Sequence, residues 1–249
     1  MVIKQVKHWI KLRASAALCK PISDWAASRN ASFTLTEDGE GFQIDEPKHA
    51  LGALRVEWGT PQRDYIEGRE LRLRLELKLS GDLQMLVIER ELLDALERAV
   101  FEAYTDTLQT RVDTDTPEEM RWLVMFNKAE HWKSKVARSR FSACAVTQEV
   151  ADAWVNSSLG EALAVASQDL VPASHAFVML TQRGNLYLRT TMLEPGIDAI
   201  KGLVRLAETA AREAQALQQR FGETGIWVST SSAAFSPSLP TAPAPDQSS

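Results

Sequence analysis

Cysteine is scarce in this chain, since its 249 residues include only Cys19 and Cys144, which lie far apart. That separation excludes a CxxC redox pair and a zinc cluster formed by neighbouring cysteines. The histidines also lack the HxxxH and HExxH spacings of a local zinc site; they are His8, His49, His131 and His175. We therefore expect neither a bound metal nor a cofactor.

Long apolar runs and catalytic signatures are absent as well. No run approaches the ~20 residues that a membrane-spanning helix needs, and the N-terminus lacks the continuous apolar segment of a secretory signal. The chain contains no GxSxG nucleophile turn and no GxxxxGKS/T phosphate loop, and Gly39-x-Gly41 lacks the third glycine of a dinucleotide fingerprint. We expect a cytoplasmic protein, and the missing motifs favour a non-catalytic one.

The basic residues are unevenly distributed. The net charge is −5, yet residues 1–23 carry five basic side chains and no acidic one, which leaves −10 on the rest of the chain. An overall negative charge argues against a nucleic-acid partner, because the phosphate backbone requires a basic surface.

Residues 2–19 have the apolar periodicity of an amphipathic helix, which Pro21 is placed to end. The other side of this helix is basic, and its tryptophan is a candidate interfacial anchor. Packing against the acidic remainder of the chain and an organellar targeting role are the alternatives to a binding role. The candidate residues for contact with an anionic membrane surface or an acidic partner are Lys4, Lys7, Trp9, Lys11 and Arg13.

Residues 70–90 contain the clearest strand pattern. Leucine occupies every second position from 71 to 79, and charged residues such as Arg72 and Arg74 lie between, a period of two that gives a strand one dry and one wet face. Residues 83–88 are apolar on both faces, and residues 80–82 (Ser-Gly-Asp) have the types found in tight turns. The pattern predicts a hairpin. Its charged face is suited to an anionic surface, although a solvated strand face has the same composition.

Residues 22–127 form the first predicted lobe, an antiparallel meander closed by a helix. An Asp-Gly turn signal joins strands at 33–36 and 42–44, a further strand covers 54–58, and a helix covers 91–108. In the acidic group at 113–119, Thr116 and Glu119 form a capping box, which favours the start of another helix over a divalent-ion site.

Residues 128–140 are strongly basic, and we expect them to form a solvated connector between two lobes. Their composition also suits phosphate contact with ring stacking, which makes them a second candidate anionic-surface site. The candidate residues are Lys128, Trp132, Lys133, Lys135, Arg138 and Arg140.

Residues 141–222 form the second predicted lobe. A strand covers 141–146, Thr147 and Ser158 begin two helices, a hairpin joins 176–181 to 186–191, and an alanine-striped helix follows from 197. Both lobes close in the order strand, turn, strand, helix, which makes duplication a hypothesis. Residues 223–249 have the proline, serine and alanine content of a disordered tail.

The predicted fold is therefore α+β, with two lobes that each consist of an antiparallel sheet closed by a C-terminal helix, preceded by a basic N-terminal helix at 1–21. We favour a non-catalytic interaction or scaffold protein that binds a protein partner or itself, and that docks on an anionic membrane surface or acidic partner through the N-terminal helix. A small-ligand binder or an enzyme with a pocket between the lobes is the alternative. No catalytic residue is assigned.

Overall fold

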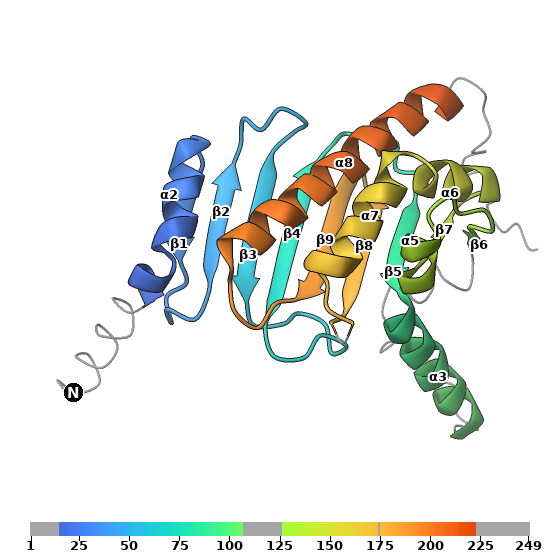
Figure 1. Cartoon of the computed structure of the whole chain (residues 1–249), viewed down its shortest axis with the longest axis horizontal. Coiled ribbons are helices and arrows are strands. Elements are labelled where there is room, and N and C mark those ends of the chain that lie inside the picture. The colour runs from blue at the N-terminus through green and yellow to red at the C-terminus, as the bar shows by residue number, and fades with distance from the viewer. Residues whose placement is uncertain (1–14, 107–125, 174, 223–249) are drawn as a thin grey trace, which may run out of the picture.

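The computed structural model describes residues 15–106, 126–173 and 175–222. Their strands form one antiparallel sheet of nine strands in the order β1-β2-β3-β4-β9-β8-β5-β7-β6 (Figure 1). The fold is mixed α and β, as predicted, but a single sheet replaces the two predicted sheets. The strands are β1 (Ser32–Leu35), β2 (Phe42–Glu46), β3 (Leu54–Gly59), β4 (Glu70–Glu76), β5 (Met85–Glu89), β6 (Asn127–Lys128), β7 (Phe141–Ala145), β8 (Phe177–Gln182) and β9 (Asn185–Thr191).

Local turn signals identified two hairpins correctly. β1 pairs with β2 across the Asp-Gly turn, where Gly39 has a φ of 68° that favours glycine. β8 pairs with β9 through the two-residue turn of Arg183 and Gly184. β3 lies between β2 and β4, so the first four strands form a meander as predicted, but β5 does not join it.

The predicted hairpin between residues 71–79 and 83–88 is wrong. β4 pairs with β3 and β9, whereas β5 pairs with β7 and β8, so the β8–β9 hairpin lies between β4 and β5. After β4, the backbone N–H groups of Leu77 and Leu79 donate to the carbonyl oxygen of Gly184, in the turn of that hairpin. Residues 80–82 therefore redirect the chain without pairing the strands they connect, and the two predicted lobes share one sheet.

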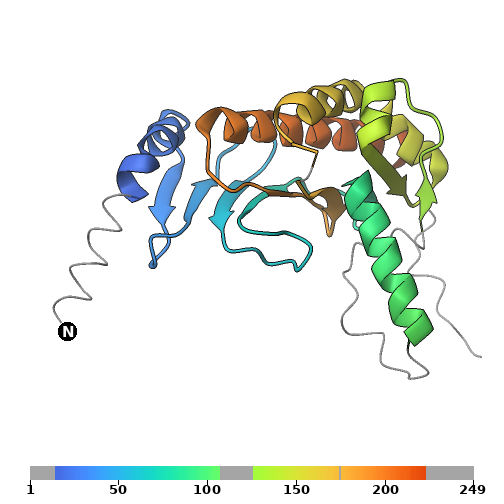
Figure 2. The same cartoon turned by 60° about the horizontal axis from the view of Figure 1, so that its bottom comes forward.

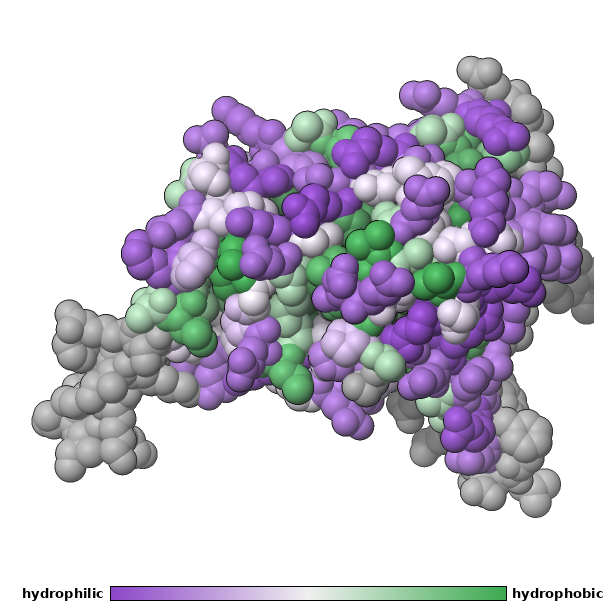
Figure 3. Space-filling view, in the orientation of Figure 1, coloured by the Kyte–Doolittle hydropathy of each residue, from purple (hydrophilic) through white to green (hydrophobic). Residues whose placement is uncertain are grey.

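Of the helices that the structure describes, five lie on one side of the sheet, with α8 and α7 side by side across it (Figures 1 and 2). Leucines 71, 73 and 75 of β4 face this layer and are buried. Trp154 is also fully buried, and its Nε1–H donates to the carbonyl oxygen of Ala210 on α8 at 3.3 Å. The outer surface of the layer is largely hydrophilic (Figure 3). The helices are α2 (Lys20–Ser28), α5 (Lys135–Arg140), α6 (Gln148–Val155), α7 (Ser158–Asp169) and α8 (Ile197–Gly222).

A smaller core lies on the opposite face of the sheet, at the start of α3 (Arg90–Asp106). From there α3 projects away from the sheet (Figure 2). The buried side chains of this core are Ile66, Leu86, Ile88, Leu92, Leu93, Cys144, Ala176, Val178 and Leu180.

The basic segment at 128–140 is not a connector between two lobes. Its first residue lies in β6, which pairs with β7 at one edge of the sheet, and its last six residues form α5, which packs beside α7. Ser134 caps α5 by accepting a hydrogen bond from the backbone N–H of Ala137.

Helix starts agree with the sequence in part. Thr147 caps α6 as predicted, by accepting from the N–H of Val150, but Ser157 rather than Ser158 caps α7. Pro21, predicted to end a helix at 2–19, lies in the first turn of α2, where its missing N–H has no cost, and most of the predicted helix lies outside the described residues.

The N-terminal candidate residues lie outside the described residues, as do the acidic group at 113–119 and residues 223–249. These candidates are Lys4, Lys7, Trp9, Lys11 and Arg13.

Candidate functional site

Across β2, β3, β4 and β9, the sheet face opposite the helix layer is charged. Side chains alternate between the two faces of a strand, and no described helix covers this part of the charged face (Figure 2). The register places Arg55 of β3 opposite Arg74 of β4, and Arg72 of β4 opposite Arg189 of β9. Like charges directly opposite each other cost stability unless counter-charges lie close by.

Glu70 supplies counter-charge beneath two of these arginines. Its side chain is 0% exposed, and its carboxylate accepts from Nη1 of Arg189 at 2.7 Å and from Nη1 of Arg72 at 3.1 Å. The backbone N–H of Gln62 donates to the same carboxylate at 2.7 Å. These charge-assisted hydrogen bonds fix the positions of both guanidinium groups.

The other two arginines pair with acidic residues farther out on the face. Nε of Arg55 donates to Asp45 at 2.7 Å, and Arg74 donates to Glu76 on its own strand. The side chains of Arg55 and Arg74 are 48% and 44% exposed, so much of each guanidinium group is accessible.

A hollow of about 180 Å³ lies among Arg55, Arg72, Arg74 and Arg189, and we call it the arginine hollow. Each of these four residues has at least one terminal guanidinium nitrogen that donates to no acceptor among the described residues: Nη2 of Arg55, Arg72 and Arg189, and Nη1 of Arg74. The remaining lining residues are Glu57, Gln62, Leu73, Tyr187 and Leu188.

Tyr187 also lines the hollow. Its hydroxyl oxygen accepts a hydrogen bond from Nδ2 of Asn185 at 3.1 Å. Unused donors that are held in place by carboxylates are suited to bind an anion, and guanidinium groups match the geometry of carboxylate and phosphate oxygens.

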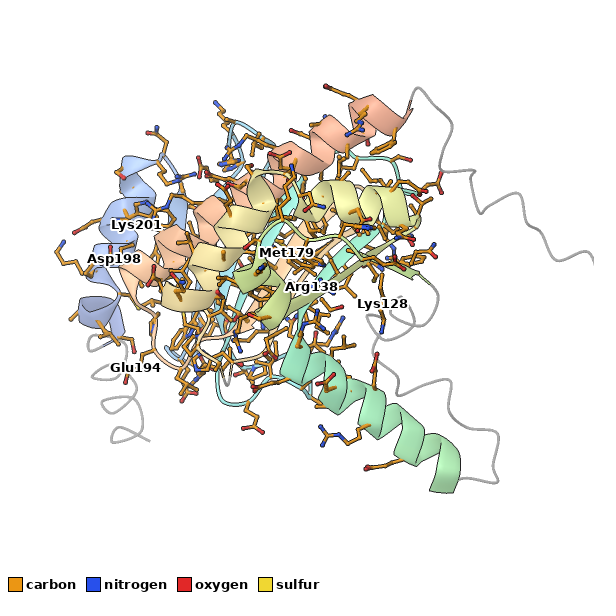
Figure 4. The ribbon with its side chains drawn as sticks, turned by 45° about the vertical axis from the view of Figure 1, so that its right-hand side comes forward. Lys128, Arg138, Met179, Glu194, Asp198 and Lys201 are labelled. Carbon is orange, nitrogen blue, oxygen red and sulfur yellow. The ribbon has the colours of Figure 1, made fainter. Side chains whose placement is uncertain are left out.

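The predicted basic surface at 128–140 does not form one binding patch. Lys128 pairs with Glu97 of α3 at 3.1 Å, whereas Arg138 lies on α5 (Figure 4). Trp132 is partly buried and packs against the larger core. Lys133 and Lys135 are exposed on either side of the α5 cap.

Arg140 has a structural role. Its guanidinium donates to Glu89 at 3.2 Å and to the carbonyl oxygens of residues 171–173. Burial raises the pKa of Glu89, and the backbone N–H groups of Leu92 and Glu91 together with the Arg140 charge only partly oppose this shift. The pair thus joins the end of β5 to the segment that precedes β8.

A second cavity, of about 530 Å³, lies at the end of the sheet near the start of α3. Its ionisable lining includes Glu67, Glu89, Glu91 and His175, but Glu89 already accepts from Arg140 and from the Leu92 N–H. Across the described ranges, no three side chains of histidine, cysteine, aspartate or glutamate gather as metal ligands. We assign no site there. The sequence predicted a pocket between two lobes, but the strands of both predicted lobes belong to one sheet, so the described residues form no boundary between lobes where such a pocket could lie.

Sequence analysis identified part of the arginine hollow. The alternation around Arg72 and Arg74 was recognised as a charged strand face, but nothing linked it to Arg55 or Arg189. The period of two placed each arginine on the wet face of its own strand. Only the strand register brings the four together.

Comparisons with protein-family models, curated proteins and solved structures found no match to this chain. Among the helices that the structure describes, none combines the length and the apolar composition needed to cross a membrane.

Proposed function

We propose that this protein is a non-catalytic binding protein that recognises an anionic group in the arginine hollow. The observation that supports this proposal is the convergence of four arginines from three strands on one small space, each with an unused N–H donor. Among the described residues that line the hollow, the carboxylate belongs to Glu57 alone, and it accepts from Nε of Arg72 at 3.0 Å. A carboxylate held in this way is poorly suited to act as a general base.

The charge pattern favours a compact anion over an extended anionic surface. Across the whole face, the four arginines are balanced by Asp45, Glu57, Glu70 and Glu76. Membranes and nucleic acids attract proteins through net positive charge spread over a wide area. A neutral face with one locally positive hollow favours a ligand whose negative charge is concentrated in one group.

The size of the arginine hollow supports the same proposal. Pockets for whole drug-sized ligands measure roughly 300–1,000 Å³, and the hollow measures about 180 Å³. It therefore has room for an anionic group, and the rest of a larger ligand would extend beyond it.

Docking of an anionic membrane surface or an acidic protein through the basic N-terminal residues stays a separate prediction. Its supporting observation is the charge of +5 on residues 1–23. Self-association and a cytoplasmic location likewise stay predictions.

Thermal unfolding with sodium phosphate, sulfate and acetate, each compared with sodium chloride at equal ionic strength, tests the anion proposal. We expect at least one of the three anions to stabilise the protein, because a ligand at 100 times its Kd adds about 2.7 kcal/mol to the folded state. Arg74→Gln should lose this stabilisation. That variant should fold, since an exposed ion pair such as Arg74 with Glu76 is worth only about 0–1 kcal/mol.

Arg212→Gln is the matched control, because Arg212 is an exposed arginine on α8, in the helix layer on the opposite side of the sheet from the hollow, and its guanidinium donates to the Thr209 hydroxyl (Figure 2). It should respond to anions as the wild type does. The proposal fails if none of the three anions exceeds chloride, or if Arg74→Gln and Arg212→Gln respond equally.

A further inference from the structure

We infer that the ligand of the arginine hollow is a phosphate monoester of a polyhydroxylated compound, such as a sugar phosphate. This inference rests on the anion-binding function proposed above. It assigns the phosphate group to the hollow and the hydroxyl groups to a groove beside it.

The unused donors of the hollow suit an anion with several acceptor oxygens. Four arginines and Glu57 line the hollow, and Asp45, Glu70 and Glu76 pair with these arginines from outside the lining. Each arginine still keeps a terminal nitrogen that none of these carboxylates uses. A phosphate monoester offers three terminal acceptor oxygens, whereas a carboxylate offers two.

The directions of the donors also favour phosphate. A planar carboxylate is satisfied by the two parallel N–H groups of a single arginine. Here the unused donors come from β3, β4 and β9, so they approach the hollow from several sides. The three terminal oxygens of a phosphate monoester can accept from several sides at once.

The adjoining groove measures about 430 Å³ and shares Glu57, Gln62 and Arg72 with the hollow. Most of its other lining side chains are polar, and they include the Thr60 hydroxyl and the Gln43 amide. Groups that both donate and accept hydrogen bonds suit a ligand with several hydroxyl groups. A ligand whose phosphate occupies the hollow would place its next atoms in this groove.

The groove is less suited to a nucleotide base. Bases bind in such sites by stacking on free aromatic rings. The aromatic residues that line the groove are Phe42, which is 1% exposed, and Trp58. Their rings stack on each other at 5.8 Å, and the Trp58 ring lies under the Arg69 guanidinium at 5.4 Å. Its Nε1–H is also used, since it donates to the Met192 carbonyl oxygen at 2.7 Å.

Isothermal titration calorimetry of the full chain with four probes tests this inference. The probes are glucose 6-phosphate, inorganic phosphate, glucose and glucuronate, which separate the phosphate from the polyol and from a carboxylate on the same polyol. We expect glucose 6-phosphate to bind at least about 10-fold more tightly than the other three, since each extra hydrogen bond to the groove adds affinity.

Two variants locate the two parts of the ligand. Arg74→Gln should weaken glucose 6-phosphate and inorganic phosphate alike, because both place phosphate in the hollow. Thr60→Val removes an exposed groove hydroxyl and keeps the backbone carbonyl that accepts from Arg72. It should weaken glucose 6-phosphate by about 3- to 10-fold and leave inorganic phosphate unchanged. Arg212→Gln should match the wild type with every probe.

The outcomes separate this inference from the function on which it rests. Equal affinity for glucose 6-phosphate and inorganic phosphate, or tighter binding of glucuronate, overturns the sugar-phosphate assignment and leaves anion binding in place. The same assignment is overturned if Thr60→Val weakens both phosphate probes equally. If glucose 6-phosphate, inorganic phosphate and glucuronate all fail to bind, and no anion stabilises the protein in the thermal experiment, both the sugar-phosphate assignment and the anion-binding function are overturned.

Discussion

Replacing Glu70 should destabilise the protein far more than replacing Glu76, although both are glutamates on β4 that pair with arginine. The Glu70 carboxylate is fully buried and accepts three hydrogen bonds, from Arg72, Arg189 and the Gln62 backbone. Removal of one partner from a buried ion pair costs about 3–5 kcal/mol. The arginine side chains are 17% exposed and water can reach them, so we expect Glu70→Ala to cost about 3 kcal/mol, the lower end of that range.

Glu76→Ala is the matched control. Its side chain is 46% exposed, and surface ion pairs of this kind contribute about 0–1 kcal/mol. Urea unfolding followed by circular dichroism gives the free energy of unfolding of each variant. Equal losses in the two variants, or a loss below about 1 kcal/mol in Glu70→Ala, would contradict the role of Glu70 as the buried counter-charge. Glu70→Gln keeps an acceptor for the Gln62 N–H, so the decrease in the free energy of unfolding of this variant reports the effect of the charge alone.

Three further predictions concern other parts of the fold. Burial raises the folded-state pKa of Glu89 above its ordinary value of 4.5, so its contribution to stability is complete below that value and is lost as the pH rises through the folded-state pKa. Wild type should therefore lose stability relative to Glu89→Gln as the pH rises above 4.5, as measured by urea midpoints at each pH, and parallel curves would contradict this. Ser157→Ala should cost about 1 kcal/mol in the same assay, because it removes the cap of α7, and Ser158→Ala should cost less. Gly52→Ala should cost about 3 kcal/mol, because Gly52 has a φ of 134° and an added Cβ would lie 1.9 Å from the Glu76 carbonyl oxygen; a melting temperature equal to that of the wild type would refute this reasoning.

The elements that sequence predicted correctly depend on neighbouring residues. The turn at Gly39, the hairpin at Gly184, the cap at Thr147 and the periodicity of α8 are all set within about ten residues. Each of these signals can be evaluated without knowing where the rest of the chain lies.

The errors arise where distant segments compete for the same partner. Turn residues at 80–82 made β4 and β5 look like a hairpin, but β4 gains seven paired residues from β9, more than 100 positions away in sequence. No local pattern encodes that choice. The sequence predicted only part of the arginine hollow for the same reason, because Arg189 comes to lie opposite Arg72 only when β4 pairs with β9.

The position of the β8–β9 hairpin has a consequence for the order of assembly. Until residue 191 has left the ribosome, β4 and β5 each lack a neighbour, and a nascent chain presents two incomplete strand edges. Of the hairpins that the structure describes, the one nearest the C-terminus is thus the one that unites the sheet. Chains truncated before residue 177 should be unable to form a continuous sheet and should aggregate through those edges, whereas chains cut after residue 222 retain every described strand.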